Sequence, residues 1–246
     1  MGRLRAPVPS LVAGERTLSG GLSRYLARVR RLRAGDTFVA FDPVTSREAD
    51  VEVIWAEHES ITLRFGPLRD GSTLATRSVT WIQGLAKGDK CDAAVRDATE
   101  LGATRIVVAA TRRSVVRLDP VRAVERQARW ARIAQEAARQ SGRSDVPRVE
   151  TPCDWSTALA LASEPETTGF CLWERAHEPL GPALLEALDG GGPLAFACGP
   201  EGGLEEREVA QAQELGWLST SLGPLALRTE TVAAAVLGSV RVLSEM

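Results

Sequence analysis

The sequence predicts an α/β fold preceded by a small β-rich domain, and three observations carry this prediction. Four runs are apolar and nearly free of charge, at 79–83, 105–110, 169–173 and 194–198. Such runs are typical of parallel strands buried on both faces of a sheet. Helix signals occur between and after them, whereas the first seventy residues contain short strand-like segments. The 246 residues therefore divide into two predicted domains, 1–72 and 73–246.

The first predicted domain contains three short β-like segments, at 38–41, 49–55 and 61–65. Two of them alternate apolar with polar residues, and turn signals separate them: Ala34-Gly35-Asp36, Asp42-Pro43 and Gly66-Pro67. We therefore expect a small β-barrel or sheet. Residues 67–76, which include Asp70-Gly71-Ser72, are the predicted linker.

The second predicted domain contains four helices with recognisable ends. Asp89 and Gly102 bound a helix from Lys90 to Leu101, and Asp119-Pro120 begins one that runs to about Gln140. The later two are expected at 204–215, before Gly216, and at 230–243, with Thr229 as the cap.

Composition excludes several classes of protein. No apolar run approaches the roughly 20 residues of a membrane span, and no apolar segment follows the N-terminal arginines as in a secretory signal. The four cysteines are widely spaced and only two histidines are present, which argues against a disulfide framework or a metal site. We expect a cytoplasmic protein with reduced thiols and no bound metal.

Positive charge is concentrated in two blocks. Residues 1–33 contain eight arginines against Glu15 alone, and residues 112–148 contain ten arginines against four acids. Residues 150–246 contain fifteen acids against four arginines. This asymmetry predicts a polyanionic partner for part of the surface. The alternatives are solvated arginine-rich helices and a composition bias of a GC-rich genome.

The turn Gly199-Pro-Glu-Gly-Gly203 is the strongest local signal for a binding site. It follows an apolar run and precedes a predicted helix, so its backbone N–H groups can approach a ligand. It matches neither the Walker A pattern nor Gly-x-Gly-x-x-Gly. A tight connection without a ligand is the alternative, but a second loop, Leu222 to Thr231, adds to the signal.

Five segments together resemble the 16S rRNA uracil-N3 methyltransferases of the SPOUT superfamily, over nearly the whole chain. They are Lys87-Gly-Asp-Lys90, Thr99-Glu-Leu-Gly102, Gln135 to Arg143, Gly199 to Gly203, and Leu227-Arg-Thr-Glu-Thr231. The resemblance implies a SPOUT-type α/β domain with a trefoil knot and an N-terminal PUA-like RNA-binding β-barrel. It also implies a homodimer that uses S-adenosylmethionine to methylate a uridine in 16S rRNA of the small ribosomal subunit.

The resemblance places the cofactor against small and apolar residues with accessible backbone. Peptide groups can satisfy the edges of adenine, and apolar side chains can cover its faces. The role of Glu201 stays open between a contact to the cofactor and support of the following helix. The expected cofactor-binding residues are Leu172, Gly199, Pro200, Glu201, Gly202, Gly203, Leu222, Gly223, Pro224, Leu227 and Thr229.

Methylation of uridine N3 requires loss of the N3 proton, to a base or through stabilisation of the uracil anion. Arg228 is the candidate catalytic residue for stabilising the anion, because it follows the cofactor loop in an acid-rich half of the chain. An ion pair with Glu230 or another carboxylate is the alternative. No histidine occurs near these loops, so no general base is assigned.

RNA contacts are expected from the basic blocks, since phosphate contacts supply affinity without reading the sequence. Gln135, Glu136, Gln140 and Arg143 are candidates for the substrate channel or the dimer seam, or are ordinary surface polarity. Tyr25 can stack on a base, although packing against the barrel is favoured. The expected RNA-binding residues are Arg24, Tyr25, Arg28, Arg31, Arg112, Arg113, Arg117, Gln135, Glu136 and Arg143, with Arg30 a further candidate.

Two positions depart from the family pattern. Arg24-Tyr25 stands where paired histidines are common, and Leu225 where an arginine is common. The alternative functions are a SPOUT methyltransferase acting on ribose 2′-hydroxyls or tRNA, and a non-catalytic RNA-binding assembly factor. A dinucleotide-binding oxidoreductase lacks its glycine fingerprint here.

Overall fold

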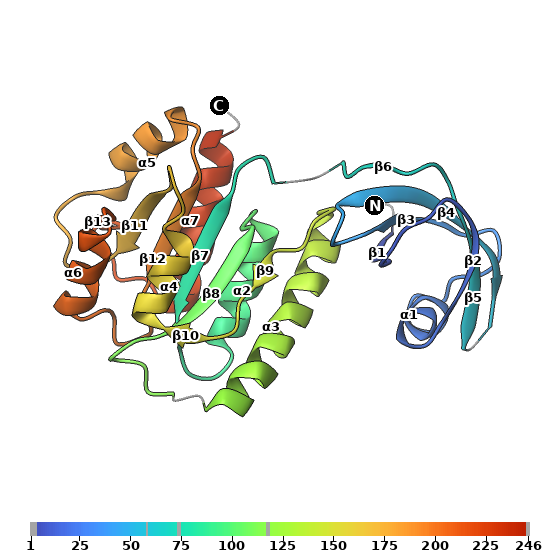
Figure 1. Cartoon of the computed structure of the whole chain (residues 1–246), viewed down its shortest axis with the longest axis horizontal. Coiled ribbons are helices and arrows are strands. Elements are labelled where there is room, and N and C mark those ends of the chain that lie inside the picture. Colours follow the sequence, from blue (N-terminus) through green and yellow to red (C-terminus); the bar gives the residue numbers. More distant parts are fainter. Residues whose placement is uncertain (1–3, 58, 73–74, 117–118, 245–246) are drawn as a thin grey trace. The chain divides into compact units, whose positions relative to one another are not determined.

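A computed structural model describes residues 4–57, 59–72, 75–116 and 119–244 (Figure 1). The chain forms two compact units. The first comprises residues 1–74 and 138–146, and the second comprises residues 75–137 and 147–246. The short segment 138–146 thus joins the N-terminal unit although it is distant in sequence. In the described part of the chain, no helix is long and apolar enough to cross a membrane.

The first unit is built on a six-stranded sheet of order β1-β3-β4-β5-β2, with β6 paired to β4. All its pairings are antiparallel except that of β1 with β3. The three predicted strands are confirmed as β3, β4 and β5, while β1, β2 and β6 were not predicted. The strands are β1 Arg5–Pro7, β2 Gly14–Ser19, β3 Thr37–Phe41, β4 Arg47–Ala56, β5 Ser60–Phe65 and β6 Arg69–Asp70.

Alternation along these strands places one face against an apolar core that includes Phe38, Val53 and Leu63. The helix α1 (Gly21–Arg24) continues into a π-helical turn, η1 (Tyr25–Val29), which contributes the fully buried Leu26 to that core. Hydrophobic burial therefore fixes one side of this short helical segment. Its arginines lie on the solvent side.

The second unit contains a seven-stranded sheet of order β10-β8-β7-β12-β11-β13, with β9 paired to β8. Every strand pairing is parallel, as the four charge-free runs predict. The short strands β9, β10 and β13 were not predicted. The strands are β7 Val79–Gly84, β8 Arg105–Ala110, β9 Arg148–Val149, β10 Cys153–Asp154, β11 Thr168–Leu172, β12 Leu194–Cys198 and β13 Leu218–Thr220.

Helices lie on both faces of this sheet. One face packs against α4 and α6 through a buried cluster that includes Ile82, Trp155 and Val209. Strand alternation turns Trp81, Phe170 and Phe196 to the opposite face, where the Phe170 and Phe196 rings stack with centroids 5.2 Å apart. The helices are α2 Lys90–Glu100, α3 Pro120–Ser141, α4 Trp155–Ala162, α5 Leu180–Asp189, α6 Glu206–Glu214 and α7 Thr229–Ser244.

The predicted helix ends are close to the observed ones. Asp119 caps α3, since its Oδ1 accepts the Arg122 N–H at 2.9 Å. Asp89 occupies the cap position of α2 but makes no side-chain cap bond. The third predicted helix starts two residues late, at Glu206, because Glu205 and Glu208 form a capping box there.

Candidate cofactor pocket

A cavity of about 870 Å³ lies in the second unit, beside the carboxyl ends of β11 and β12. Three segments form most of its wall: 172–174 after β11, 198–203 after β12, and 221–229 before α7. Because parallel strands end at the same edge of a sheet, segments distant in sequence meet there. All eleven residues expected to bind the cofactor line this cavity, together with Arg228 and Leu225.

The glycine turn is folded tightly onto itself and onto β7. The Gly203 N–H donates to the Pro200 carbonyl at 2.9 Å, and Gly203 has a φ of 70°. A Cβ atom on Gly199 would lie 2.6 Å from the Gly203 carbonyl carbon. The turn thus requires glycine at these two positions, for close approach and for positive φ.

The N-terminus of α6 does not need an external anion. The Glu205 N–H is bonded to Glu208 Oε2 at 2.9 Å, and Glu208 Oε1 accepts the Arg112 N–H at 2.8 Å. Carboxylates of the chain therefore already complement the helix dipole. The glycine turn precedes a helix, as the sequence predicts, but the N-terminus of that helix is complemented by the protein's own carboxylates.

Gln83 and Thr229 hold two walls of the cavity together. Gln83 Nε2 donates to Thr229 Oγ1 at 2.8 Å, and Thr229 Oγ1 donates to the Gly199 carbonyl at 2.7 Å. The Gln83 side chain is fully buried and its Oε1 accepts the Trp81 Nε1–H at 3.3 Å. Sequence reasoning missed Gln83, although a polar residue near the end of an apolar strand was a usable signal. The Thr229 hydroxyl is thus occupied within the protein.

Glu201 ties the glycine turn to the loop before α2. Its Oε1 accepts the Lys87 N–H at 3.0 Å and lies 3.1 Å from Lys90 Nζ. Burial alone would raise the pKa of Glu201, but hydrogen bonds from its own N–H, Lys87 and Lys90 hold that pKa below its ordinary value. These partners give Glu201 a structural role in the turn.

Arg228 lines the cavity and is exposed. Among the residues that the structure describes, its guanidinium has no hydrogen bond or ion pair, and the alternative pairing with Glu230 is not formed. A guanidinium without an internal partner is available to an anionic ligand.

Glu174 is a second charged residue at the cavity that sequence reasoning missed. It follows β11 by two residues, and its carboxylate lies over the glycine turn: a Cβ on Gly203 would be 2.9 Å from Glu174 Oε1. The usable signal was an acid directly after a buried parallel strand, at the edge where loops form binding sites.

Four candidate RNA-binding arginines, Arg24, Arg28, Arg30 and Arg31, are exposed on or just after α1 and η1 in the first unit. Within the described ranges none of them makes an ion pair. Their charge is therefore available to phosphates.

Arg112 and Arg113 support the second unit's loops. Arg113 Nη1 donates to the Gly202 carbonyl at 2.8 Å, and Arg112 Nε lies 3.9 Å from Glu205 Oε2. Both side chains remain exposed, so these contacts leave donors free for a ligand. Arg117 lies outside the described residues.

The remaining candidates have different surroundings. Tyr25 packs against the apolar core of the first unit, as favoured from the sequence, and the Arg139 guanidinium lies 5.2 Å from its ring centroid. Arg143 is 5% exposed and forms a two-point ion pair with Asp145, at 3.0 and 2.6 Å, so this buried side chain does not fit the RNA contact expected from the sequence. Gln135, Glu136 and Gln140 are exposed on α3.

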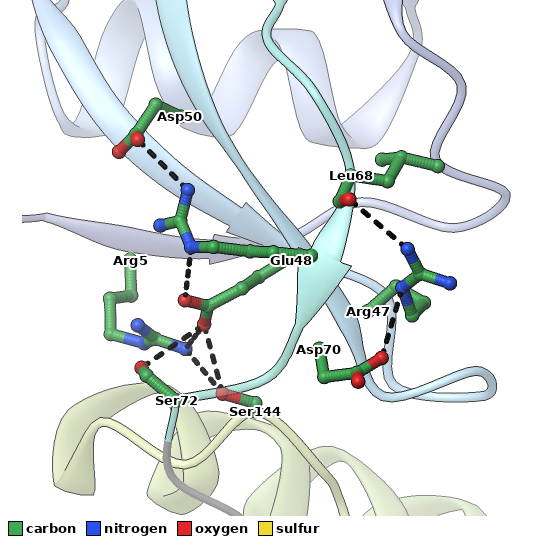
Figure 2. Close-up of polar contacts among 9 residues, drawn as sticks. Arg5, Arg47, Glu48, Asp50, Leu68, Asp70, Ser72 and Ser144 are labelled. Carbon is green, nitrogen blue, oxygen red and sulfur yellow. Dashed lines mark hydrogen bonds and ion pairs between the residues drawn. The ribbon is translucent and has the colours of Figure 1, made fainter.

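The first unit also contains a buried charged cluster centred on Glu48 (Figure 2). Arg5 Nη2 donates to Glu48 Oε2 at 2.7 Å, Ser144 Oγ donates to the same oxygen at 3.0 Å, and Arg69 Nε donates to Oε1 at 3.0 Å. Burial raises the pKa of Glu48, but hydrogen bonds from Arg5, Ser144 and Ser72 outweigh it and bring the pKa to about 2. The cluster fixes the segment around Ser144 on the sheet of the first unit.

The thiols of the second unit are unsuited to nucleophilic chemistry. Burial raises the pKa of Cys171 and of Cys198 to about 12. In the described residues, no group of three His, Cys, Asp or Glu side chains is arranged to hold a metal ion.

Known proteins are similar to this chain over most of its length. Residues 73–241 match the model of the RNA methyltransferase domain. The chain is 35% identical over 233 residues to ribosomal RNA small subunit methyltransferase E of Bacillus subtilis, covering 94% of this chain and 91% of the relative. The protein of the same name from Mycobacterium bovis is 32% identical, with 89% and 83% covered.

Similarity extends to a solved structure. Ribosomal RNA small subunit methyltransferase E from Neisseria gonorrhoeae, bound to S-adenosyl methionine, is 28% identical and has a TM-score of 0.86. The match covers 98% of each chain.

Proposed function

This chain belongs to the RNA methyltransferase family of ribosomal RNA small subunit methyltransferase E, and on that premise we propose that it methylates N3 of a uridine in 16S rRNA. S-adenosylmethionine is the methyl donor. The observation that carries the proposal is the cavity formed by the loops after β11 and β12 and before α7, in a chain similar to a protein solved with this cofactor. The rRNA substrate follows from the relatives' names, and the N3 position is the finer proposal.

The residues at the cavity fit S-adenosylmethionine. Its volume of about 870 Å³ lies within the range of small-molecule sites. Leu172, Leu222 and Leu227 offer apolar walls for adenine, and the glycine turn brings peptide groups close to the ligand. We place the cofactor against these walls, with Glu201 and Thr229 supporting the loops through the contacts described above.

In the proposed reaction the protein positions the cofactor and the uracil and supplies one positive charge beside the uracil. Bound S-adenosylmethionine supplies an electrophilic methyl group. The step breaks the S–CH3 bond, forms the N3–CH3 bond and passes the N3 proton to solvent water. Arg228 donates hydrogen bonds to the uracil carbonyl oxygens and so stabilises the negative charge that develops as N3 loses that proton. Its guanidinium is suited to this role because it presents several N–H donors in one plane and has no partner in the described structure.

The first unit is proposed to bind the RNA as a PUA-like domain. Support comes from the exposed arginines on α1 and η1, which form no ion pair with any residue that the structure describes, beside an apolar core that holds this segment in place. Phosphate contacts from this surface would position the rRNA without reading its sequence.

The second unit is proposed to contain the trefoil knot of the SPOUT superfamily and to act as a homodimer in the cytoplasm. Leu225, which is 78% exposed beside the cavity, is an apolar side chain that a second copy would cover. Light scattering coupled to gel filtration measures the oligomeric state directly, and a monomer at micromolar concentration would contradict the dimer.

Nucleoside mass spectrometry of 16S rRNA and, in parallel, of tRNA tests the function. A deletion strain should lose N3-methyluridine, and the wild-type gene should restore it while the Arg228→Ala gene should not. Retained N3-methyluridine in the deletion strain would contradict the proposed site. Loss of a 2′-O-methyl or tRNA mark instead would indicate a different substrate, and failure to bind S-adenosylmethionine would indicate an assembly factor.

A further inference from the structure

The cavity contains four charged side chains, and only two of them are paired with one another. Lys90 and Glu201 form an ion pair of 3.1 Å. Glu174 and Arg228 also line the cavity, and neither has a side-chain partner in the part of the chain that the structure describes. One carboxylate and one guanidinium are therefore left to meet charges on a ligand.

The position of Glu174 is set by its backbone surroundings. The Trp173 N–H, one residue before it, donates to the Thr220 carbonyl at 2.9 Å, which anchors the start of the loop to the end of β13. The Glu174 carboxylate lies against Gly203, and a Cβ there would lie 2.9 Å from Glu174 Oε1 and push the carboxylate aside. The absence of a Cβ at Gly203 thus makes room for a carboxylate directly over the glycine turn.

The proposed cofactor has charges that match this arrangement. Its methionyl end has two cationic groups, the α-ammonium and the sulfonium, and one anionic group, the α-carboxylate, so its net charge is positive, while its adenosine end is neutral. Glu201 is already neutralised by Lys90 and by the Lys87 N–H, so it is not available to these cations. Glu174 is the carboxylate at the cavity that remains without a counter-charge in the described residues.

We propose that Glu174 is a cofactor-binding residue whose carboxylate pairs with the cationic methionyl end of S-adenosylmethionine. The inference rests on the proposed function and deepens it, because it assigns opposite tasks to the two unpaired charges. Glu174 binds the cation of the cofactor, and Arg228 is left for the anion that develops on the substrate.

Calorimetry on the full chain tests the pairing with three ligands. S-adenosylmethionine has both cations, S-adenosylhomocysteine has only the ammonium, and 5′-methylthioadenosine has neither. Glu174→Gln should weaken S-adenosylmethionine binding about tenfold, a typical effect for one charge-assisted hydrogen bond. Binding of 5′-methylthioadenosine should not change. An equal loss for S-adenosylhomocysteine identifies the ammonium as the partner, and a loss for S-adenosylmethionine alone identifies the sulfonium.

Matched variants separate this role from a structural one. Glu174→Asp should retain part of the affinity, because the charge remains. Glu178→Gln removes an exposed acid from the same loop that does not line the cavity, so affinity should stay at the wild-type value. The difference in S-adenosylmethionine affinity between wild type and Glu174→Gln should also become smaller at high salt, because salt screens the charge pair.

Two results would overturn the inference. Wild-type affinity of Glu174→Gln for S-adenosylmethionine would exclude the pairing while leaving the proposed function intact. Equal losses for all three ligands would mean that Glu174 only shapes the cavity. A wild-type chain that binds none of the ligands would instead contradict the proposed function itself.

Discussion

At the scale of single residues, the cavity depends on polar atoms that form hydrogen bonds within the protein. Thr229 Oγ1 links the Gln83 amide to the Gly199 carbonyl, so α7, β7 and the glycine turn share one hydroxyl. Thr229 was expected to bind the cofactor, but the structure gives its hydroxyl two internal partners. A residue can therefore line a cofactor site and act mainly by holding its walls.

Thr229→Val should lower the free energy of unfolding by about 1–3 kcal/mol, because it removes the hydroxyl that accepts from Gln83 and donates to the Gly199 carbonyl. Among the residues that the structure describes, Gln83 Nε2 then keeps only its bond to the Gly84 carbonyl. Urea titration measures this loss. S-adenosylmethionine affinity should fall as well, since the glycine turn loses its tie. Thr231→Val is the control, because Thr231 lies two residues further along α7 and is exposed. This variant should have the same free energy of unfolding as wild type. Unchanged stability of Thr229→Val would show that the network contributes nothing.

Gly84 illustrates a second constraint, close approach of two backbones. A Cβ there would lie 2.6 Å from the Gly199 carbonyl carbon, so Gly84→Ala must displace the glycine turn. We expect the variant to lose cofactor affinity at least tenfold in calorimetry. Gly181→Ala in α5, where a Cβ meets no atom within 4 Å, is the matched control and should bind normally. Normal binding by Gly84→Ala would mean that the turn tolerates displacement.

Arg228→Ala should lower turnover far more than cofactor affinity, because its proposed partner is the uracil anion. A loss of about 100-fold in kcat is the expected size for one donor to developing charge. Rates of methyl transfer and calorimetric Kd values measured side by side check this split. Arg207→Ala, an exposed arginine of α6, controls for loss of positive charge in the unit. Equal losses in kcat and affinity would place Arg228 in the cofactor site instead.

Sequence alone identified the parts of the site whose chemistry is local. Gly199 to Gly203 and Leu222 to Leu227 stand out because turns and close backbone approach demand particular residues. Gln83 and Glu174 were missed because their importance arises only when strands pair: β12 lies beside both β7 and β11. The sequence marks each as a polar residue at or after the end of an apolar strand, but it does not show which segments that residue will meet.

At the scale of elements, long buried strands were predictable and short ones were not. A run such as 194–198 is free of charge because both of its faces are covered, and that is visible without a structure. Strands of two or three residues, such as β9 and β13, have too few positions to show any period. The capping box at Glu205 moved the start of α6 because side-chain hydrogen bonds, not apolar periodicity, decide where a helix begins.

The Glu48 cluster gives strand β4 a pH-dependent contribution to stability. The folded-state pKa of Glu48, about 2, is below its ordinary value of 4.5. Its contribution is therefore complete above pH 4.5 and is lost as the pH falls towards 2. Glu48→Gln should lower the free energy of unfolding by about 3 kcal/mol at pH 7, since Arg5 loses its buried counter-charge.

Hydrogen exchange at β4 and at residues 139–146 measures this effect locally. The difference in exchange protection between wild type and Glu48→Gln should become smaller below pH 4.5. Glu52→Gln is the control, because Glu52 is on the same strand and pairs with Arg64 at an exposed site. This substitution should change exchange protection only slightly. A pH-independent difference would mean that packing, not charge, holds the segment around Ser144.

At the scale of the whole molecule, the net charge of −2 is the sum of basic and acidic segments that differ strongly in charge. The clustering of arginines in residues 1–33 is visible in the sequence, and the structure leaves those on α1 and η1 exposed and without ion pairs in its described ranges. The joining of residues 138–146 to the N-terminal unit was not predictable, because it depends on the Ser144–Glu48 hydrogen bond across 96 positions of the chain.

Replacement of Arg28 and Arg31 together by Gln tests the role of this surface in RNA binding. Each phosphate contact releases counterions, so the slope of log affinity against log salt should fall by about 0.7 to 0.9 for each lost contact. The double variant should bind rRNA more weakly at low salt and lose less affinity as salt rises. Its affinity for S-adenosylmethionine should equal that of wild type, because every residue of the cavity belongs to the other unit.

The charge-preserving pair Arg28→Lys and Arg31→Lys separates charge from shape in the same assay. If phosphates are the partners, the lysine variant should keep the wild-type slope of log affinity against log salt. The reason is that the number of counterions released depends on the number of positive charges and not on the geometry of the guanidinium. If the arginines instead stack on bases or read base edges, lysines should weaken binding while the slope stays at the wild-type value. A wild-type slope in the Gln pair would exclude this surface as the RNA platform. The positive charge that attracts rRNA would then have to lie on the second basic block, where Arg112 and Arg113 remain exposed.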